Sequence, residues 1–94
     1  MRIIGTAELY EFARKHAGAR KPLANWEKVV RAAVWKNSEE MKRTFGSVDY
    51  DDPRTIFDLA GNRVRLIALV DFKKQLIHIT GVMTHAEYDK GKWK

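Results

Sequence analysis

Cysteine is absent from all 94 residues of the chain. Its absence excludes a disulfide framework, a zinc site built on thiolates and a cysteine nucleophile. A small domain without disulfides fits a reducing compartment, so we expect a cytoplasmic protein.

Long apolar runs are missing as well. The longest ones fall far short of the ~20 residues that a membrane-spanning helix needs. The opening MRIIGTAELYEF turns polar after four positions, which is too soon for the apolar core of a secretory signal. We therefore expect no membrane segment.

Acidic residues are outnumbered: 12 Asp and Glu stand against 18 Lys and Arg, which gives a formal net charge of +6. Such a balance favours a polyanionic partner such as nucleic acid or the ribosome, although a merely lysine-rich soluble surface would give the same number. The length fits a single domain over residues 1–94 with one core.

The first half of the chain has helical periodicity. Residues 2–4 read as a short strand, and Thr6 is the predicted N-cap of a helix that ends near Gly18. Pro22 suits the first turn of a second helix, because its missing N–H is not needed there. The apolar stripe of the second helix comprises Leu23, Trp26, Val29, Val30, Ala33 and Val34.

A third, short helix is predicted over SEEMKRTF, with Ser38 as its N-cap and Gly46 as its stop. The following SVDYDDP reads as a loop, because proline and three aspartates disfavour both helix and strand. Two of the aspartates are adjacent, but no second ligand cluster accompanies them, so we expect no metal there.

From Thr55 onward the period changes to that of strands. Three are predicted, at about 56–59, 63–71 and 76–82, with turns at AGN and FKKQ. The fold class is therefore α+β, with helices followed by an antiparallel meander.

The register of the last hairpin decides which polar groups meet. If Lys73 and Lys74 form a two-residue turn, position 69 pairs with 78, 67 with 80 and 65 with 82. One face is then wholly apolar and should be covered by the helices. The other face is predicted to be open and to present Arg65 near His85, which follows the last strand.

The histidines differ in their settings. His85 begins a short polar segment, HAEYDK, and one helical turn there would project His85 and Tyr88 from the same side. His78, between isoleucines, suits a structural ring, and His16 suits a helix C-terminus. Their spacing forms no metal site, and no cofactor motif is present. Trp93 either closes the edge of the core or stacks on a base.

A basic face with arginine, histidine, lysine and tyrosine suits one reaction class in particular. In metal-free RNA cleavage the ribose 2′-hydroxyl attacks its own adjacent phosphate. The reaction needs a base, an acid and a cation on the transition state. Histidine titrates near neutrality, and arginine can hold two phosphate oxygens.

The C-terminal half resembles the HigB-type toxins of type II toxin–antitoxin systems, in the RelE/ParE superfamily. The resemblance rests on FD at 57–58, GN at 61–62, RL at 65–66, VM at 82–83, TH at 84–85 and EYD at 87–89. The N-terminal half matches in layout and in WK followed by SEEMK. Some relatives continue beyond the position of Lys94.

The resemblance implies a small twisted antiparallel sheet of three to four strands packed on two N-terminal helices. It also implies an mRNA endoribonuclease that acts on ribosome-engaged messages, a helix-turn-helix antitoxin and, through that antitoxin, repression of operator DNA. We assign catalysis to Arg65, His85, Tyr88 and Lys90, and RNA contacts to Asn62, Arg63 and Lys92.

Two other readings stay open. The superfamily also includes toxins that poison a protein target without cutting RNA, and a basic face can bind without cleaving. An inactive copy that serves only as an operon co-repressor is the weaker alternative.

Overall fold

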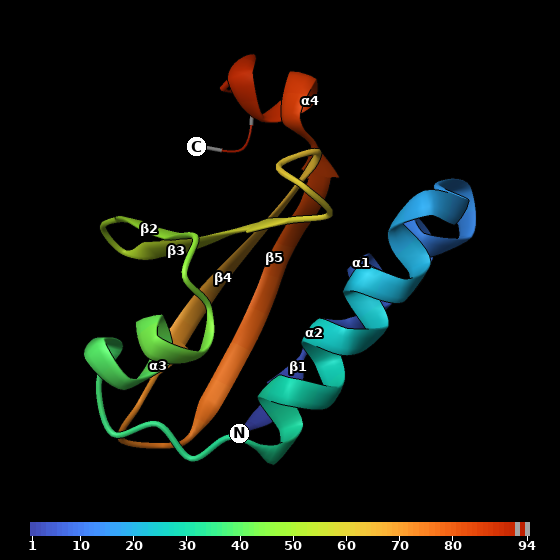
Figure 1. Ribbon diagram of the computed structural model, residues 1–94. Coiled ribbons are helices and arrows are strands. Elements are labelled where there is room, and N and C mark those ends of the chain that lie inside the picture. The colour runs from blue at the N-terminus through green and yellow to red at the C-terminus, as the bar shows by residue number, and fades with distance from the viewer. Residues whose placement is uncertain (92, 94) are drawn as a thin grey trace.

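A five-stranded mixed sheet organises the computed structural model, which describes residues 1–91 and 93. Its strand order is β1-β5-β4-β3-β2, and helices cover one face (Figure 1). In chain order the elements are β1 (Arg2–Ile4), α1 (Thr6–Lys15), a 3-10 turn η1 (Ala17–Ala19), α2 (Arg20–Ala32), α3 (Ser38–Thr44), β2 (Val48–Asp51), β3 (Arg54–Leu59), β4 (Val64–Asp71), β5 (Leu76–Thr84) and α4 (His85–Asp89).

The core lies between the helices and the covered face of the sheet. Leu23, Trp26 and Val30 are fully buried along α2, as the apolar stripe predicts. Trp26 meets Phe57 of β3 edge to face, with ring centroids 5.4 Å apart. Such aromatic pairs add to the stabilisation that burial alone provides. The stripe ends with the helix, because Val34 lies beyond α2 and is 75% exposed.

The first strand makes the sheet mixed, and the sheet has five strands where the resemblance implies three to four. β1 pairs with β5 in parallel, and Ile3 faces Ile77. The N-terminal amine of Met1 donates to the carbonyl oxygen of Val30 at 2.9 Å, which ties the start of β1 to the end of α2. The sequence pattern identified this strand but contained no information about its partner.

Two predicted helix caps are one residue out of place. Thr6 is the first residue of α1, and the cap is Gly5 in the left-handed conformation (φ 85°) without a side-chain hydrogen bond. Glycine is needed there because a Cβ would collide with the carbonyl of Ile79. At α3 the cap is Asn37, whose side-chain oxygen accepts from the Glu40 N–H at 3.0 Å, and not Ser38. α1 also ends earlier than predicted, at Lys15.

The predicted loop after α3 is wrong in part, since residues 48–51 form the edge strand β2. Its register against β3 pairs Val48 with Phe57 and Asp51 with Arg54. Val48 packs on the core, whereas the aspartates stay exposed. Pairing with β3 therefore overrides the weak strand propensity of the aspartates.

The last hairpin follows the predicted register only at its turn end. Leu69 pairs with His78 as expected, but a bulge at Thr80 shifts the remaining pairs, so that Ile67 faces Gly81 and Arg65 faces Met83. The extra residue moves Val82 onto the core face. β5 thus reaches Thr84, two residues beyond the predicted end.

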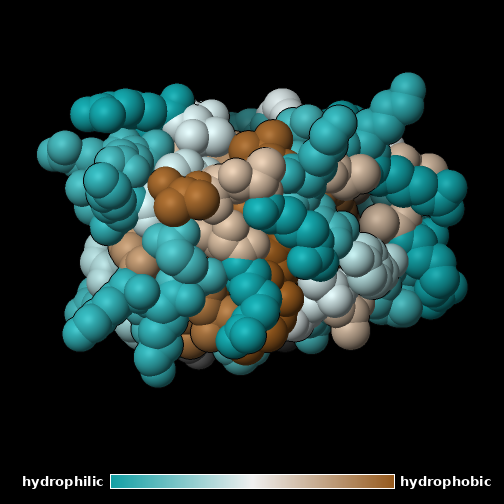
Figure 2. Space-filling model, turned by 90° about the horizontal axis from the view of Figure 1, so that it is seen from below, coloured by the Kyte–Doolittle hydropathy of each residue, from teal (hydrophilic) through white to brown (hydrophobic). Residues whose placement is uncertain are grey.

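No helix within residues 1–91 and 93 is long and apolar enough to cross a membrane. Seen from the end where the β4–β5 hairpin lies, apolar side chains gather in the middle and hydrophilic ones surround them (Figure 2).

Candidate active site

The site lies at the end of the sheet where β5 runs into α4 (Figure 1). Three neighbouring strands contribute here: β3 brings Asp58, β4 brings Arg65, and β5 leads into His85. Asp58 and Arg65 are direct cross-strand partners in the β3–β4 ladder. The β3–β4 turn, residues 60–63, is the remaining part of the site.

That turn is shaped by left-handed backbone conformations. Ala60, Gly61 and Asn62 all have positive φ angles of 56°, 61° and 75°. The conformation directs the Asn62 carbonyl to Nη1 of Arg65 at 2.9 Å, and the Arg63 carbonyl accepts the His85 backbone N–H at 2.9 Å. The turn therefore holds both the arginine and the first residue of α4.

A capping box fixes where α4 begins. The Oγ of Thr84 accepts from the Glu87 N–H at 3.1 Å, and the Glu87 carboxylate accepts from the Thr84 N–H at 3.0 Å. These hydrogen bonds hold the pKa of Glu87 below its ordinary value. Because the box satisfies two amides that a helix start leaves open, it sets His85 as the first helical residue.

Arg65 is buried, and the expectation of an open arginine is wrong. Its residue exposure is 6%, and Nε lies 2.9 Å from Asp58 Oδ1. The contact between Arg65 and Asp58 is an ion pair without the alignment of a hydrogen bond. Nη2 lies 2.8 Å from Nδ1 of His85. The guanidinium thus joins three segments of the chain at once.

These contacts determine the tautomer of His85. Arginine can only donate, so Nδ1 must accept and the ring proton must lie on Nε2. The Nε2 atom lies 3.1 Å from a carboxylate oxygen of Asp89, one turn further along α4. The His85 side chain is half exposed, at 50%, so the imidazole is held in orientation and still faces solvent.

Tyr88 packs over the arginine. The guanidinium carbon of Arg65 lies 5.4 Å from the Tyr88 ring centroid, a cation–π contact. Trp93 stacks on the same ring with a centroid separation of 4.8 Å and an interplanar angle of 9°, and its indole N–H donates to the Tyr88 carbonyl at 2.8 Å. His85 and Tyr88 therefore both meet Arg65, as one helical turn predicts.

Burial shifts two ionisable groups of the site. It raises the pKa of the Asp58 carboxyl, against the opposing charge of Arg65 and with the help of nearby Asp49. It also raises the pKa of the Tyr88 hydroxyl, which the carboxylates of Asp49 and Asp58 reinforce. Tyrosine is already a neutral phenol at neutral pH, and this shift extends the neutral form to higher pH.

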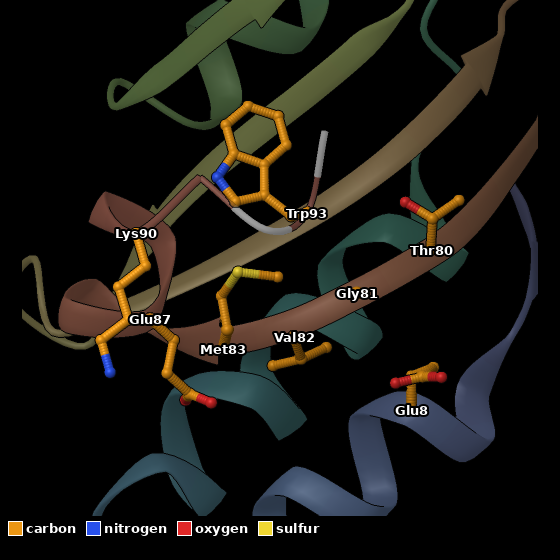
Figure 3. Close-up of a pocket in the computed structure, with 8 residues that line it drawn as sticks. All are labelled: Glu8, Thr80, Gly81, Val82, Met83, Glu87, Lys90 and Trp93. Carbon is orange, nitrogen blue, oxygen red and sulfur yellow. The ribbon is translucent and has the colours of Figure 1, made fainter.

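The other predicted site residues lie around this centre. Asn62 contributes its backbone carbonyl, and its side chain is exposed. The Arg63 Nε donates to the Ala60 carbonyl at 2.9 Å. Lys90 caps the end of α4, is exposed, and projects away from Trp93 (Figure 3). Lys92 lies outside the described residues.

Two carboxylates of the site were not predicted. Asp58 could have been found from the β3–β4 hairpin, because a four-residue turn at 60–63 places it opposite Arg65. Asp89 could have been found from its spacing of four after His85 on a helix. In the part of the chain that the structure describes, no group of three or more histidine or acidic side chains is placed to hold a metal ion.

Comparison with known proteins gives consistent matches. The model of a family described as HigB_toxin, the RelE-like toxic component of a toxin–antitoxin system, matches residues 19–91. The mRNA interferase toxin HigB of Escherichia coli strain K12 is 33% identical over 92 residues, which cover 95% of this chain and 88% of that protein. The mRNA interferase HigB of Escherichia coli O6:H1 is 31% identical over 93 residues, which cover 96% and 90%.

Proposed function

The chain belongs to the HigB family, the RelE-like toxic components of toxin–antitoxin systems, and from that premise we propose that it is an mRNA interferase, an endoribonuclease that inhibits translation. The observation that carries the proposal is the row of contacts from Asp58 through Arg65 to His85. It holds a half-exposed imidazole beside a cation, as metal-free RNA cleavage requires.

In the proposed reaction the 2′-oxygen of a ribose forms a bond to its adjacent phosphorus, and the bond from phosphorus to the 5′-oxygen breaks. The 2′-hydroxyl proton goes to a base, and the 5′-oxygen receives a proton from an acid. The products are a 2′,3′-cyclic phosphate and a 5′-hydroxyl end.

His85 is the proposed base, and its tautomer dictates how it acts. The ring can accept a proton only at Nδ1, which is bonded to Arg65 in this structure. The Arg65 N–H must therefore turn from Nδ1 to a phosphate oxygen when the substrate binds. This exchange frees the base and brings the guanidinium charge onto the phosphate in the same step.

The remaining residues bind and orient the RNA. Tyr88, a neutral phenol at neutral pH, donates a hydrogen bond to the phosphate or the departing oxygen. Lys90 neutralises phosphate charge from the end of α4, and the sugar-phosphate backbone of the RNA is contacted by Asn62, Arg63 and Lys92. Asp89 steadies the His85 ring from its Nε2 side.

The proposal extends to the cellular setting that the family suggests. The substrate is a message engaged by a ribosome in the cytoplasm. A helix-turn-helix antitoxin neutralises the toxin, and the pair represses its own operator DNA. The formal charge of +6 supports association with RNA-rich assemblies.

Primer extension on cellular messages tests the proposal. Expression of the protein without antitoxin should create new 5′ ends within translated regions. The same message with its start codon removed should stay intact if the ribosome is required. Growth arrest without new message ends would instead identify a toxin that acts on another target.

A non-catalytic toxin is the second candidate. It is favoured by the engagement of Arg65 with Asp58, Asn62 and His85, which leaves little of the guanidinium for a substrate. The nearby carboxylate of Asp49 would also repel phosphate. Under this reading the protein binds its target with the same face and operates as a binding module or operon co-repressor.

A further inference from the structure

A groove lies on the face of the sheet opposite α1 and α2, beside the candidate active site. Its floor is formed by Ile67 and Gly81, and its walls by Leu69, Met83, Arg54 and Trp93. We propose that this groove binds a nucleobase of the RNA next to the cleaved phosphate. The inference rests on the proposed nuclease function and adds a subsite for a base.

The floor is flat and apolar. Ile67 is only 2% exposed, so it closes the bottom of the groove. Gly81 has no side chain, and a Cβ there would come within 3.0 Å of the Met83 methyl group. A glycine inside a strand often marks a place where a ligand approaches the backbone closely. Here the neighbour is the end of a flexible side chain, so a planar ring can reach the backbone at Gly81 once the Met83 methyl group turns aside.

The walls carry an aromatic ring and a cation, the pair that stacks on bases. The guanidinium carbon of Arg54 lies 5.7 Å from the Trp93 ring centroid. Thr80 and Met83 project from β5 on the side where Trp93 lies, whereas Val82 projects the other way (Figure 3). Sequence-tolerant binding of single-stranded RNA relies on such stacking surfaces with a cation nearby.

The groove adjoins the candidate active site through Trp93. Trp93 stacks on Tyr88, Tyr88 covers Arg65, and Arg65 holds His85. A strand whose phosphate lies at His85 would thus bring a neighbouring base to the groove. A protein segment in the groove would have to bury the charge of Arg54 at the rim of the groove, which is costly unless the segment supplies an opposite charge.

The test measures binding of 2′-O-methyl hexa-adenylate, an RNA that cannot be cleaved because its 2′-oxygens are blocked. The groove is filled by Leu69→Trp, since Leu69 is 38% exposed and lines it. The matched control is Ile4→Trp, because Ile4 is 41% exposed on β1 and does not line the groove. Gly81→Ala, which raises the floor, serves as a second variant, and thermal unfolding verifies that each variant folds.

Binding should weaken about tenfold in Leu69→Trp, as loss of one base stack predicts, and stay unchanged in Ile4→Trp. Replacing one adenosine at a time with an abasic nucleotide identifies the base involved. One abasic position should weaken binding to the wild type about tenfold and have no further effect on Leu69→Trp.

Equal binding by Leu69→Trp and the wild type would overturn the subsite. So would loss of antitoxin neutralisation in Leu69→Trp with RNA binding intact, which would assign the groove to a protein. Cleavage is scored separately on a translated message. A wild type that binds the probe but never cuts would refute the nuclease function alone, because the abasic comparison would still support the groove.

Discussion

Replacing Arg65 with methionine tests the role of the buried cation. The substitution keeps most of the side-chain volume but removes the partner of Asp58, whose side chain is 19% exposed. It also leaves the Asn62 carbonyl and the His85 Nδ1 without their donor. Removing one member of a buried ion pair typically costs 3–5 kcal/mol, and partial exposure of Asp58 suggests the lower end, roughly 3 kcal/mol.

The cost should depend on pH in a defined direction. Burial raises the pKa of Asp58 in the folded protein, and the charge of Arg65 opposes that rise. Without Arg65 the pKa rises further. A carboxyl whose pKa is higher in the folded than in the unfolded protein stabilises the fold when it is protonated. Its contribution to the free energy of unfolding is therefore present below its unfolded-state pKa and is lost as the pH rises through its folded-state pKa. Arg65→Met should therefore be much less destabilising near pH 4 than at about pH 7.

Urea unfolding at both pH values measures this difference. The double variant Arg65→Met with Asp58→Leu should recover most of the lost stability, because an apolar pair leaves no buried charge. Arg31→Met, which breaks an exposed pair with Glu27, should have little effect. A loss below ~1 kcal/mol at neutral pH, or the same loss at both pH values, would refute the role assigned to the buried pair.

Three further outcomes follow from the structure. Thr84→Ala removes the capping box of α4 and should lower the free energy of unfolding by roughly 1 kcal/mol, measured with urea. The rate of RNA cleavage should fall by more than that free energy corresponds to, because the box also positions His85. Leu23→Ala should cost about 2–5 kcal/mol by the same method, because Leu23 is fully buried. The Tyr88 hydroxyl should ionise above the ordinary value near 10, seen as a high-pH component of the tyrosinate absorbance that Tyr88→Phe removes.

Local patterns in the sequence predict most of the elements. The apolar stripe of α2 and the alternation of β4 and β5 both reflect burial on one face, which a single segment reveals by itself. Together with the two-residue turn assumed at Lys73 and Lys74, the alternation also predicts that Arg65 and His85 lie close together. This prediction is confirmed even though the register changes between them.

The features that sequence patterns do not predict depend on distant partners. The bulge at Thr80 depends on how β5 fits both β4 and the helices. The Thr80 hydroxyl donates to the Ile67 carbonyl of β4 at 3.2 Å. Gly5 caps α1 because Ile79, far along the chain, leaves no room for a side chain. β2 exists because β3 offers it an edge.

The burial of Arg65 is the clearest difference at the site. Strand alternation assigns it to the face without long helices, and that assignment is right. The face is not open there, however, because α4 and Trp93 fold back over it. The consequence is chemical: an exposed arginine would contact phosphate directly, whereas this one first has to release His85.

The most direct test of the proposed function is the cleavage rate of His85→Ala on a translated message, measured by primer extension beside His78→Ala. His78 is an exposed histidine on β5 that lies outside the site, so it controls for loss of an imidazole. If His85 transfers the proton, its removal should slow cleavage about 10²–10⁴-fold, while His78→Ala cleaves like the wild type. Cleavage by His85→Ala within a few-fold of the wild-type rate would contradict the proposed role of His85.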